Sequence, residues 1–178
     1  MNARIWVAAD HHMGHANILN FKREDGSLIR GAVFKNTHEH DEVIIARHNE
    51  VVKPEDHVYF LGDFAINKKC IPLATRMIGH KRLVRGNHDQ AKTRVYIENG
   101  FEEIYGVRVF TANDQQGKTG FVLSHVPIHP NSVPRWGRNV HGHLHQNIVL
   151  DQNGHPDPRY ICVSLEHTNY YPVLLSSL

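Results

Sequence analysis

The chain has few of the features that define several protein classes. It contains only two cysteines, Cys70 and Cys162, and neither forms a C-x-x-C pair. The sequence therefore does not favour a zinc knuckle or a disulfide framework, and we expect two buried, inert thiols in a reducing cytoplasm. No apolar run approaches the roughly 20 residues of a membrane helix. The apolar run at residues 5–9 is also too short for a signal peptide.

A strong charge of one sign is also missing. Lysine and arginine number 20 and aspartate and glutamate 18, which gives a formal net charge of +2. Proteins that hold nucleic acid mainly by phosphate neutralisation need a basic surface. We therefore expect no strong basic nucleic-acid-binding patch, and no membrane partner. The 178 residues, 40% of them hydrophobic, fit one globular domain over residues 1–178.

Short apolar runs alternate with helical patterns in the first half of the chain. Strands are predicted at residues 4–9, 57–61 and 81–85, and helices at 38–52, 67–78 and 91–99. The second half favours a hairpin (107–111 and 120–124, around the polar stretch 113–117) and strands at 148–150, 160–164 and 171–175. This order predicts one α/β domain with two packed sheets.

Histidine is the residue in excess, with 16 copies spread along the chain. Groups of histidine, aspartate and asparagine follow predicted strands: Asp10-His11-His12, Gly62-Asp63, Gly86-Asn87-His88-Asp89, Ser124-His125 and His141-Gly142-His143-Leu144-His145. Ligands of open α/β sheets bind beyond the carboxyl ends of the strands. These five groups are therefore expected to converge on one place.

The residue types in these groups indicate a metal centre. Imidazole and carboxylate without thiolate suit Mn, Fe, Zn or Ni. At least seven ligands are offered, which is about what two ions need if one carboxylate bridges them. Asp10 and His12 lie two residues apart and would point the same way from an extended segment, and the same holds for His143 and His145.

The series D-x-H, G-D, G-N-H-D, H and G-H-x-H, which runs from Asp10 to His145, resembles the calcineurin-like metallophosphoesterase superfamily. The resemblance implies a four-layer α/β/β/α sandwich of two mixed sheets and a two-metal site. Matching motif positions imply these ligands: Asp10, His12 and His145 for the first ion, Asp63 as the bridge, and Asn87, His125 and His143 for the second. His88 matches the catalytic histidine that acts on the leaving group.

Departures from the family pattern narrow the expected activity. The protein Ser/Thr phosphatases extend G-D to G-D-x-V-D-R-G and write G-N-H-E, whereas residues 62–68 here lack the arginine and Asp89 replaces the glutamate. The short chain instead resembles compact bacterial or phage-type members near the phosphodiesterase branch. We expect a hydrolase of small or nucleotide-type phosphoesters with two divalent ions, Mn favoured and Fe, Zn or Ni as alternatives.

The expected reaction follows from such a site. A hydroxide held between two divalent ions would attack phosphorus in line, because metals lower the pKa of bound water from about 15.7 to about 7. His88, if protonated, would donate a proton to the leaving oxygen. A phosphomonoesterase with the same site and a non-catalytic metal-binding module are the alternatives. The sequence leaves the substrate and the oligomeric state open.

Several other residues near the motifs have expected roles. His11 should face away from His12 and play a structural part. His15, Arg23 and Arg30 are the candidates for contacting substrate; the two arginines lie on residues 22–35, which form either a flap or a solvated loop. Solvated or capping positions are expected for the histidines on helices and at strand starts: His38, His40, His48, His57 and His80.

Overall fold

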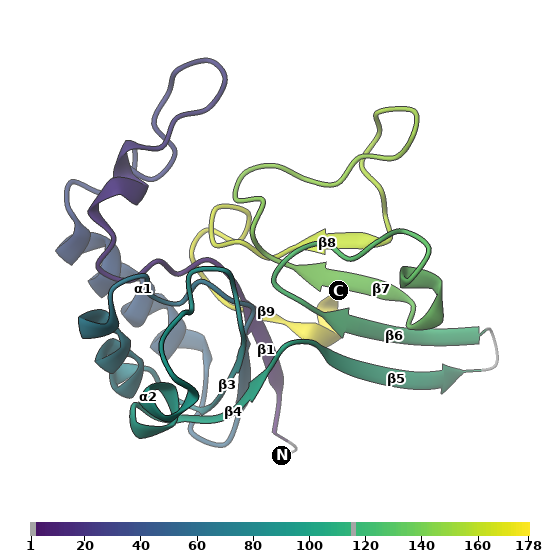
Figure 1. The fold of residues 1–178 in the computed structure, drawn as a ribbon, viewed down its shortest axis with the longest axis horizontal. Coiled ribbons are helices and arrows are strands. Elements are labelled where there is room, and N and C mark those ends of the chain that lie inside the picture. Colours follow the sequence, from purple (N-terminus) through teal and green to yellow (C-terminus); the bar gives the residue numbers. More distant parts are fainter. Residues whose placement is uncertain (1–2, 115–116) are drawn as a thin grey trace.

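Two mixed β-sheets and a set of helices make up the fold in this computed structural model, which describes residues 3–114 and 117–178 (Figure 1). The first sheet has the order β4-β3-β2-β1-β9. Its strands are β1 (Ile5–Ala8), β2 (His57–Phe60), β3 (His80–Val84), β4 (Phe101–Tyr105) and β9 (Val173–Leu174). The first four are parallel, and β9 runs antiparallel to β1.

The second sheet has the order β5-β6-β7-β8. Its strands are β5 (Arg108–Asp114), β6 (Gly117–Leu123), β7 (Arg138–His141) and β8 (Tyr160–Cys162). The first pair is antiparallel, and the other two pairs are parallel. The expected α/β class with two mixed sheets is therefore confirmed.

The helices are α1 (Thr37–Val51), α2 (Thr93–Glu98) and four 3₁₀ segments: η1 (Ala16–Asn20), η2 (Lys68–Arg76), η3 (Val133–Arg135) and η4 (Leu175–Ser177). The side chain of Asn36 accepts a hydrogen bond from the backbone N–H of Glu39, so α1 begins after Asn36. The helix expected near residue 70 is the 3₁₀ segment η2, which contains Pro72. Proline has no N–H for an α-helical bond. Among the described residues, no helix has the length and apolar character needed to cross a membrane.

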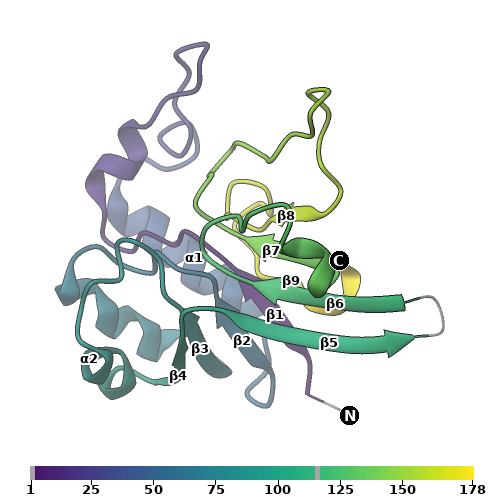
Figure 2. The ribbon, with the colours of Figure 1, turned by 45° about the vertical axis from the view of Figure 1, so that its right-hand side comes forward.

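Two hydrophobic clusters lie on the two faces of the first sheet. Side chains on β1 alternate between them: Trp6 packs under the helices with Ile44 and Ile71, while Val7 packs against the second sheet with Val140. Helices α1 and α2 with η2, the first sheet and the second sheet thus form three successive layers (Figures 1 and 2).

A loop covers the outer face of the second sheet. The buried Asn139 side chain on β7 accepts a hydrogen bond from the Ile128 backbone N–H at 3.0 Å. Tyr160 on β8 donates to the Ile128 carbonyl at 2.8 Å. Val133 of η3 is fully buried. Within the described residues, η3 and its loop stand where a second helical layer is expected.

Some predicted elements differ from the observed ones. The hairpin is confirmed, but β5 and β6 extend into the predicted loop at 113–117, of which residues 115–116 lie outside the described residues. The strand predicted at 148–150 is wrong, because Leu150 makes only an isolated bridge to Pro156. Strands β4 and β7 were not predicted. Two helical histidines expected to be solvated, His40 and His48, are buried.

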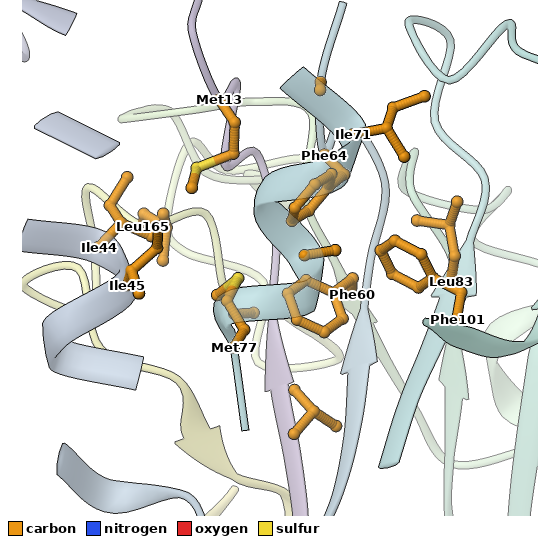
Figure 3. Packing of buried hydrophobic residues seen from close by; sticks show 14 of the residues in the cluster. Met13, Ile44, Ile45, Phe60, Phe64, Ile71, Met77, Leu83, Phe101 and Leu165 are labelled. Atoms are coloured by element: carbon orange, nitrogen blue, oxygen red, sulfur yellow. The ribbon is translucent and has the colours of Figure 1, made fainter. Parts of the chain in front are cut away.

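A substitution at Phe60 tests the packing of the hydrophobic cluster between the first sheet and the helices. Its ring meets those of Phe64 and Phe101 edge to face at centroid distances of 5.5 Å (Figure 3), and it is fully buried. Phe60→Ala should lower the free energy of unfolding by about 3–5 kcal/mol, measured by urea titration. Val107→Ala, at a half-exposed position, should change it by less than about 0.5 kcal/mol. Equal effects of the two substitutions would contradict this packing.

Candidate metal centre

The loops that follow five strands meet at one edge of the two sheets. Backbone hydrogen bonds join these loops: Asp10 N–H to the Gly62 carbonyl at 3.1 Å, His12 N–H to the Asp63 carbonyl at 2.9 Å, and Gly142 N–H to the His125 carbonyl at 2.9 Å. The parallel strands β1, β2 and β3 end side by side, as do β6 and β7. The expected convergence of the strand ends is confirmed.

Two groups of potential metal ligands form at this edge. Asp10, His12 and His145 make the first group, and Asp63, His125 and His143 make the second. Within each group, one nitrogen or oxygen atom of every side chain lies within 4.8 Å of the others. These are the groupings that the motif resemblance implies.

The second group has four candidate ligands around one point. The Nε2 atom of His125 lies 2.9 Å from Oδ1 of Asn87, 3.2 Å from Nδ1 of His143 and 3.4 Å from Oδ2 of Asp63. The structure therefore brings Asn87 to the group that the motif resemblance implies for it.

Asp63 lies between the two groups. Its Oδ2 is 3.7 Å from Nε2 of His12 in the first group and 3.4 Å from Nε2 of His125 in the second. Its Oδ1 accepts a hydrogen bond from the His88 backbone N–H at 2.9 Å. One carboxylate oxygen is thus fixed by the backbone, and the other faces both groups.

The buried polar atoms fit divalent cations. Oδ1 of Asp10 and Nε2 of His12 are buried 4.0 Å apart, and neither has a hydrogen-bond partner in the part of the chain that the structure describes. Such unsatisfied buried atoms are rare in native proteins. Burial lowers the pKa of His12 to about 2, which keeps its imidazole in the neutral form that binds metals.

Hydrogen bonds to neighbouring groups orient the ligands. Oδ2 of Asp10 accepts from the Ser164 hydroxyl at 2.6 Å and from the His143 backbone N–H at 2.8 Å, which leaves Oδ1 for the site. Nδ1 of His125 donates to the Leu61 carbonyl at 2.9 Å, so Nε2 faces the site. Such partners fix the tautomer and the ring orientation of metal-binding histidines.

Arg30 and Glu166 form hydrogen bonds to residues of the first group from the protein interior. The Arg30 guanidinium is fully buried and donates to Glu166 at 2.9 Å and to the Asp10 carbonyl at 2.5 Å. Glu166 accepts from Nδ1 of His145 at 2.9 Å. Burial would raise the pKa of Glu166, but the charge of Arg30 and the bond to His145 hold it well below its ordinary value.

The prediction that Arg30 contacts substrate is therefore wrong. Its side chain has no exposed surface, and its donors are used by Glu166, His40 and the carbonyls of His11 and Asp10. Arg30 instead contacts Glu166 and the Asp10 backbone in the protein interior, behind the first group of candidate ligands.

Glu166→Gln should separate this positioning role from simple packing. The amide keeps the shape but removes the charge that faces Arg30 and His145. Loss of such an outer partner typically weakens metal binding about 10–100-fold. Equilibrium dialysis with Mn²⁺ should show this loss for one ion of two. Glu98→Gln, on the exposed face of α2, should leave both affinities unchanged. Unchanged Mn²⁺ binding in Glu166→Gln would contradict the role.

The backbone at the site is strained. Seven described non-glycine residues have positive φ, and five of them are candidate ligands: Asp10, His12, Asp63, His143 and His145. Each non-glycine residue in the left-handed conformation costs about 1–3 kcal/mol of folding free energy, and such residues cluster at functional sites. The expected extended segments for D-x-H and G-H-x-H are therefore wrong. Tight left-handed turns, rather than strand alternation, bring the paired side chains to one place.

Asp89 orders the turn that carries Asp63. Its Oδ2 accepts from the backbone N–H groups of Asp63 at 2.7 Å and Gly86 at 2.9 Å. A Cβ atom on Gly86 would lie 2.2 Å from Oδ1 of Asp63, so a glycine is needed there. Asp89 had a sequence signal as the last residue of G-N-H-D, whereas Ser164 and Glu166 had none.

The other candidates lie outside the two groups. His88 is 42% exposed, and its Nε2 lies 3.9 Å from Oδ2 of Asp63, outside both groups. The half-buried ring of His15 lies 5.6 Å from that of His12. Arg23 is exposed on the loop at residues 21–29 and donates to the Leu28 carbonyl. His11 packs on Phe60 at 4.8 Å, which confirms its structural part.

The chain with this mixed α/β fold and its two adjoining Asp/His groups is similar to several known proteins. No model of a known protein family matches the chain. It is 31% identical over 180 residues to the uncharacterized protein MJ1445 of Methanocaldococcus jannaschii, covering 97% of this chain and 87% of the relative. The chain belongs to the same family as MJ1445.

Phage proteins and one solved structure are also similar. The gene 66 protein of Mycobacterium phage L5 is 22% identical over 177 residues, covering 84% of this chain and 81% of its own. The gene 66 protein of Mycobacterium phage D29 is 24% identical over 189 residues, covering 92% of this chain and 88% of the phage protein. The crystal structure of the protein of unknown function AQ665 from Aquifex aeolicus superposes with a TM-score of 0.68 at 26% identity, covering 99% and 97%.

Proposed function

We propose that this protein is a dinuclear metal-dependent phosphoesterase of the calcineurin-like type. Its substrates are phosphodiesters of small or nucleotide-type molecules, and Mn is the favoured metal. The observation that carries the proposal is the position of Asp63, whose Oδ2 faces His12 on one side and His125 on the other. The fold is then a reduced α/β/β/α sandwich, in which η3 and its loop replace the outer helices.

The candidate ligands and Asn87 have distinct roles in the proposed hydrolysis. Asp10, His12 and His145 would hold one ion, His125, His143 and Asn87 the other, and Asp63 both. When bound, the two ions supply an activated water and neutralise charge on the phosphoryl group. The exposed Asn87 directs its amide oxygen toward His125, which leaves its NH₂ group to donate to a phosphoryl oxygen.

His88 is placed to move a proton. Its backbone N–H donates to Asp63, while its side chain remains 42% exposed with Nε2 3.9 Å from Oδ2 of Asp63. From there Nε2–H can donate to the oxygen that leaves phosphorus. The leaving alcohol departs protonated, and the phosphoryl group keeps the oxygen that came from water.

The diester preference is supported by the residues after Asp63. Phe64 and Ala65 are buried in the core below the helices, and Asn67 occupies the position of the arginine that the protein phosphatases use for a protein-bound phosphate. A compact site without that arginine favours a substrate recognised by its organic groups.

A phosphoester panel with Mn²⁺, Ni²⁺, Zn²⁺ and Mg²⁺ tests the proposal. Bis-p-nitrophenyl phosphate and cyclic nucleotides (2′,3′ and 3′,5′) should be hydrolysed faster than p-nitrophenyl phosphate, and phosphoserine peptides slowest. Faster hydrolysis of the monoester would instead assign a phosphomonoesterase. Efficient dephosphorylation of phosphoserine peptides would contradict the substrate class. Metal binding without any hydrolysis would indicate a non-catalytic module and contradict the enzyme.

A further inference from the structure

A groove opens directly beside the metal centre, between residues 21–29 and residues 143–147. Its volume is about 380 Å³, and it is lined by His143 and His145 of the two ligand groups together with Phe21, Lys22 and Gln146. The organic substituent of a phosphate at the metal centre can therefore reach this groove.

One wall of the groove is a preformed hairpin. Arg23 and Ile29 donate backbone hydrogen bonds to Ser27 and Phe21 at 2.8 Å, and Lys22 pairs with Leu28 in an antiparallel bridge. The loop of residues 21–29 projects from the body of the protein in both views (Figures 1 and 2). Since its backbone is already paired, this wall does not need to order when a ligand binds.

Phe21 is the exposed aromatic ring of this wall. Its ring stands edge-on to His145, with centroids 6.3 Å apart, and to His15, with centroids 6.2 Å apart. It nevertheless remains 42% exposed, beside residues that line the metal centre. An aromatic side chain held in this way is suited to stacking on a planar base.

The polar lining favours an uncharged or anionic planar ligand. Lys22 is the single lining residue with a permanent charge, and Glu24 and Asp25 lie in the adjoining hollow with Arg23. The carboxylate of Asp25 accepts hydrogen bonds from the hydroxyl and the backbone N–H of Ser27. The amides of Gln146 and Asn147 lie on the wall formed by residues 143–147, where they can donate and accept at the edge of a base.

We propose that this groove binds the base of a nucleotide phosphodiester whose phosphate lies at the metal centre. Phe21 stacks on the base, and Gln146 and Asn147 contact its edge. The inference rests on the proposed function and narrows its substrate class from phosphodiesters in general to nucleotides.

Two chromogenic diesters test it: the p-nitrophenyl ester of thymidine 5′-monophosphate, and methyl p-nitrophenyl phosphate, which has no base. In both, water adds to phosphorus and the bond to the nitrophenyl oxygen breaks, which yields p-nitrophenol and a monoester. Phe21→Ala should raise KM for the thymidine ester about 5- to 150-fold, the loss that corresponds to one stacked base. It should change hydrolysis of the methyl ester less than about twofold.

Control variants define the outcome. Phe21→Trp should keep the low KM for the thymidine ester, since it retains an aromatic face. Val33→Ala removes an exposed apolar side chain that is not among the groove residues and should have no effect. Equal losses on both diesters in Phe21→Ala would mean that Phe21 acts by supporting His145, and would overturn the inference. Unchanged kinetics on the thymidine ester would overturn it as well.

Binding gives a readout that does not depend on turnover. Thymidine 5′-monophosphate should bind the Mn-loaded wild-type protein and bind Phe21→Ala at least about fivefold more weakly by isothermal titration calorimetry. If neither diester is hydrolysed but this difference is found, the proposed function fails and the groove stands. If both diesters are hydrolysed and the variant binds the nucleotide as the wild type does, the groove fails and the proposed function stands.

Discussion

Asp63→Asn should abolish nearly all phosphodiester hydrolysis and weaken the binding of both metal ions. The substitution removes the negative charge that lies 3.7 Å from His12 and 3.4 Å from His125, at the point shared by the two ligand groups. The loss in Mn²⁺ affinity should exceed the 10–100-fold that removal of an outer partner typically causes, so at least about 100-fold is expected. Equilibrium dialysis and initial rates on bis-p-nitrophenyl phosphate measure the two effects.

A matched aspartate provides the control. Asp151 accepts backbone hydrogen bonds from Asn153 and His155, which an amide oxygen accepts equally well. Asp151→Asn should therefore keep wild-type rates and two bound ions. Wild-type turnover in Asp63→Asn, or loss of one ion with the other unaffected, would refute the bridging position.

His88→Ala should keep both metal ions and lose rate in proportion to the need of the leaving group for a proton. Nε2 of His88 lies outside both ligand groups and is 42% exposed. p-Nitrophenolate leaves without protonation, whereas a nucleoside alkoxide does not. Acid catalysis is worth roughly 10²–10⁴-fold where it is needed. The loss should reach this range on a dinucleotide and be much smaller on the thymidine p-nitrophenyl ester.

Metal analysis and two-substrate kinetics distinguish the alternatives. His155→Ala, at an exposed position on the loop of residues 147–157, should change neither rate nor metal content. If His88→Ala instead loses an ion, His88 is a ligand. If both substrates suffer equally while chemistry limits the rate, His88 stabilises charge rather than giving a proton.

The convergence of the candidate ligands was predictable because strands and their ends leave a clear pattern. Apolar runs at β1, β2 and β3 stop at Asp10, Asp63 and Asn87, and parallel strands of one sheet end at one edge. The grouping of Asp10 with His145 came from the motif resemblance, because 135 residues separate them in the chain. The structure places both in the first group.

The support behind the ligands was not predictable. Glu166 has no motif around it, and Arg30 belongs to a polar segment typical of a solvated loop, yet they meet in the interior and orient His145. Strand β7 was missed because buried Asn139 and His141 alternate with Val140, a pattern that is not apolar. Left-handed turns at Asp10 and Asp63 depend on tertiary contacts such as the hydrogen bond that the Asp63 backbone N–H donates to Asp89.

The number of Mn²⁺ ions that hydrolysis requires tests whether the metal centre is dinuclear. Metal-stripped protein should be titrated with Mn²⁺ while bound metal and bis-p-nitrophenyl phosphate hydrolysis are followed in the same samples. The two ligand groups joined by Asp63 predict saturation at two ions per chain and a rate that rises as the second ion binds. Saturation at one ion, or full hydrolysis by protein kept in excess chelator, would contradict a dinuclear metal-dependent phosphoesterase.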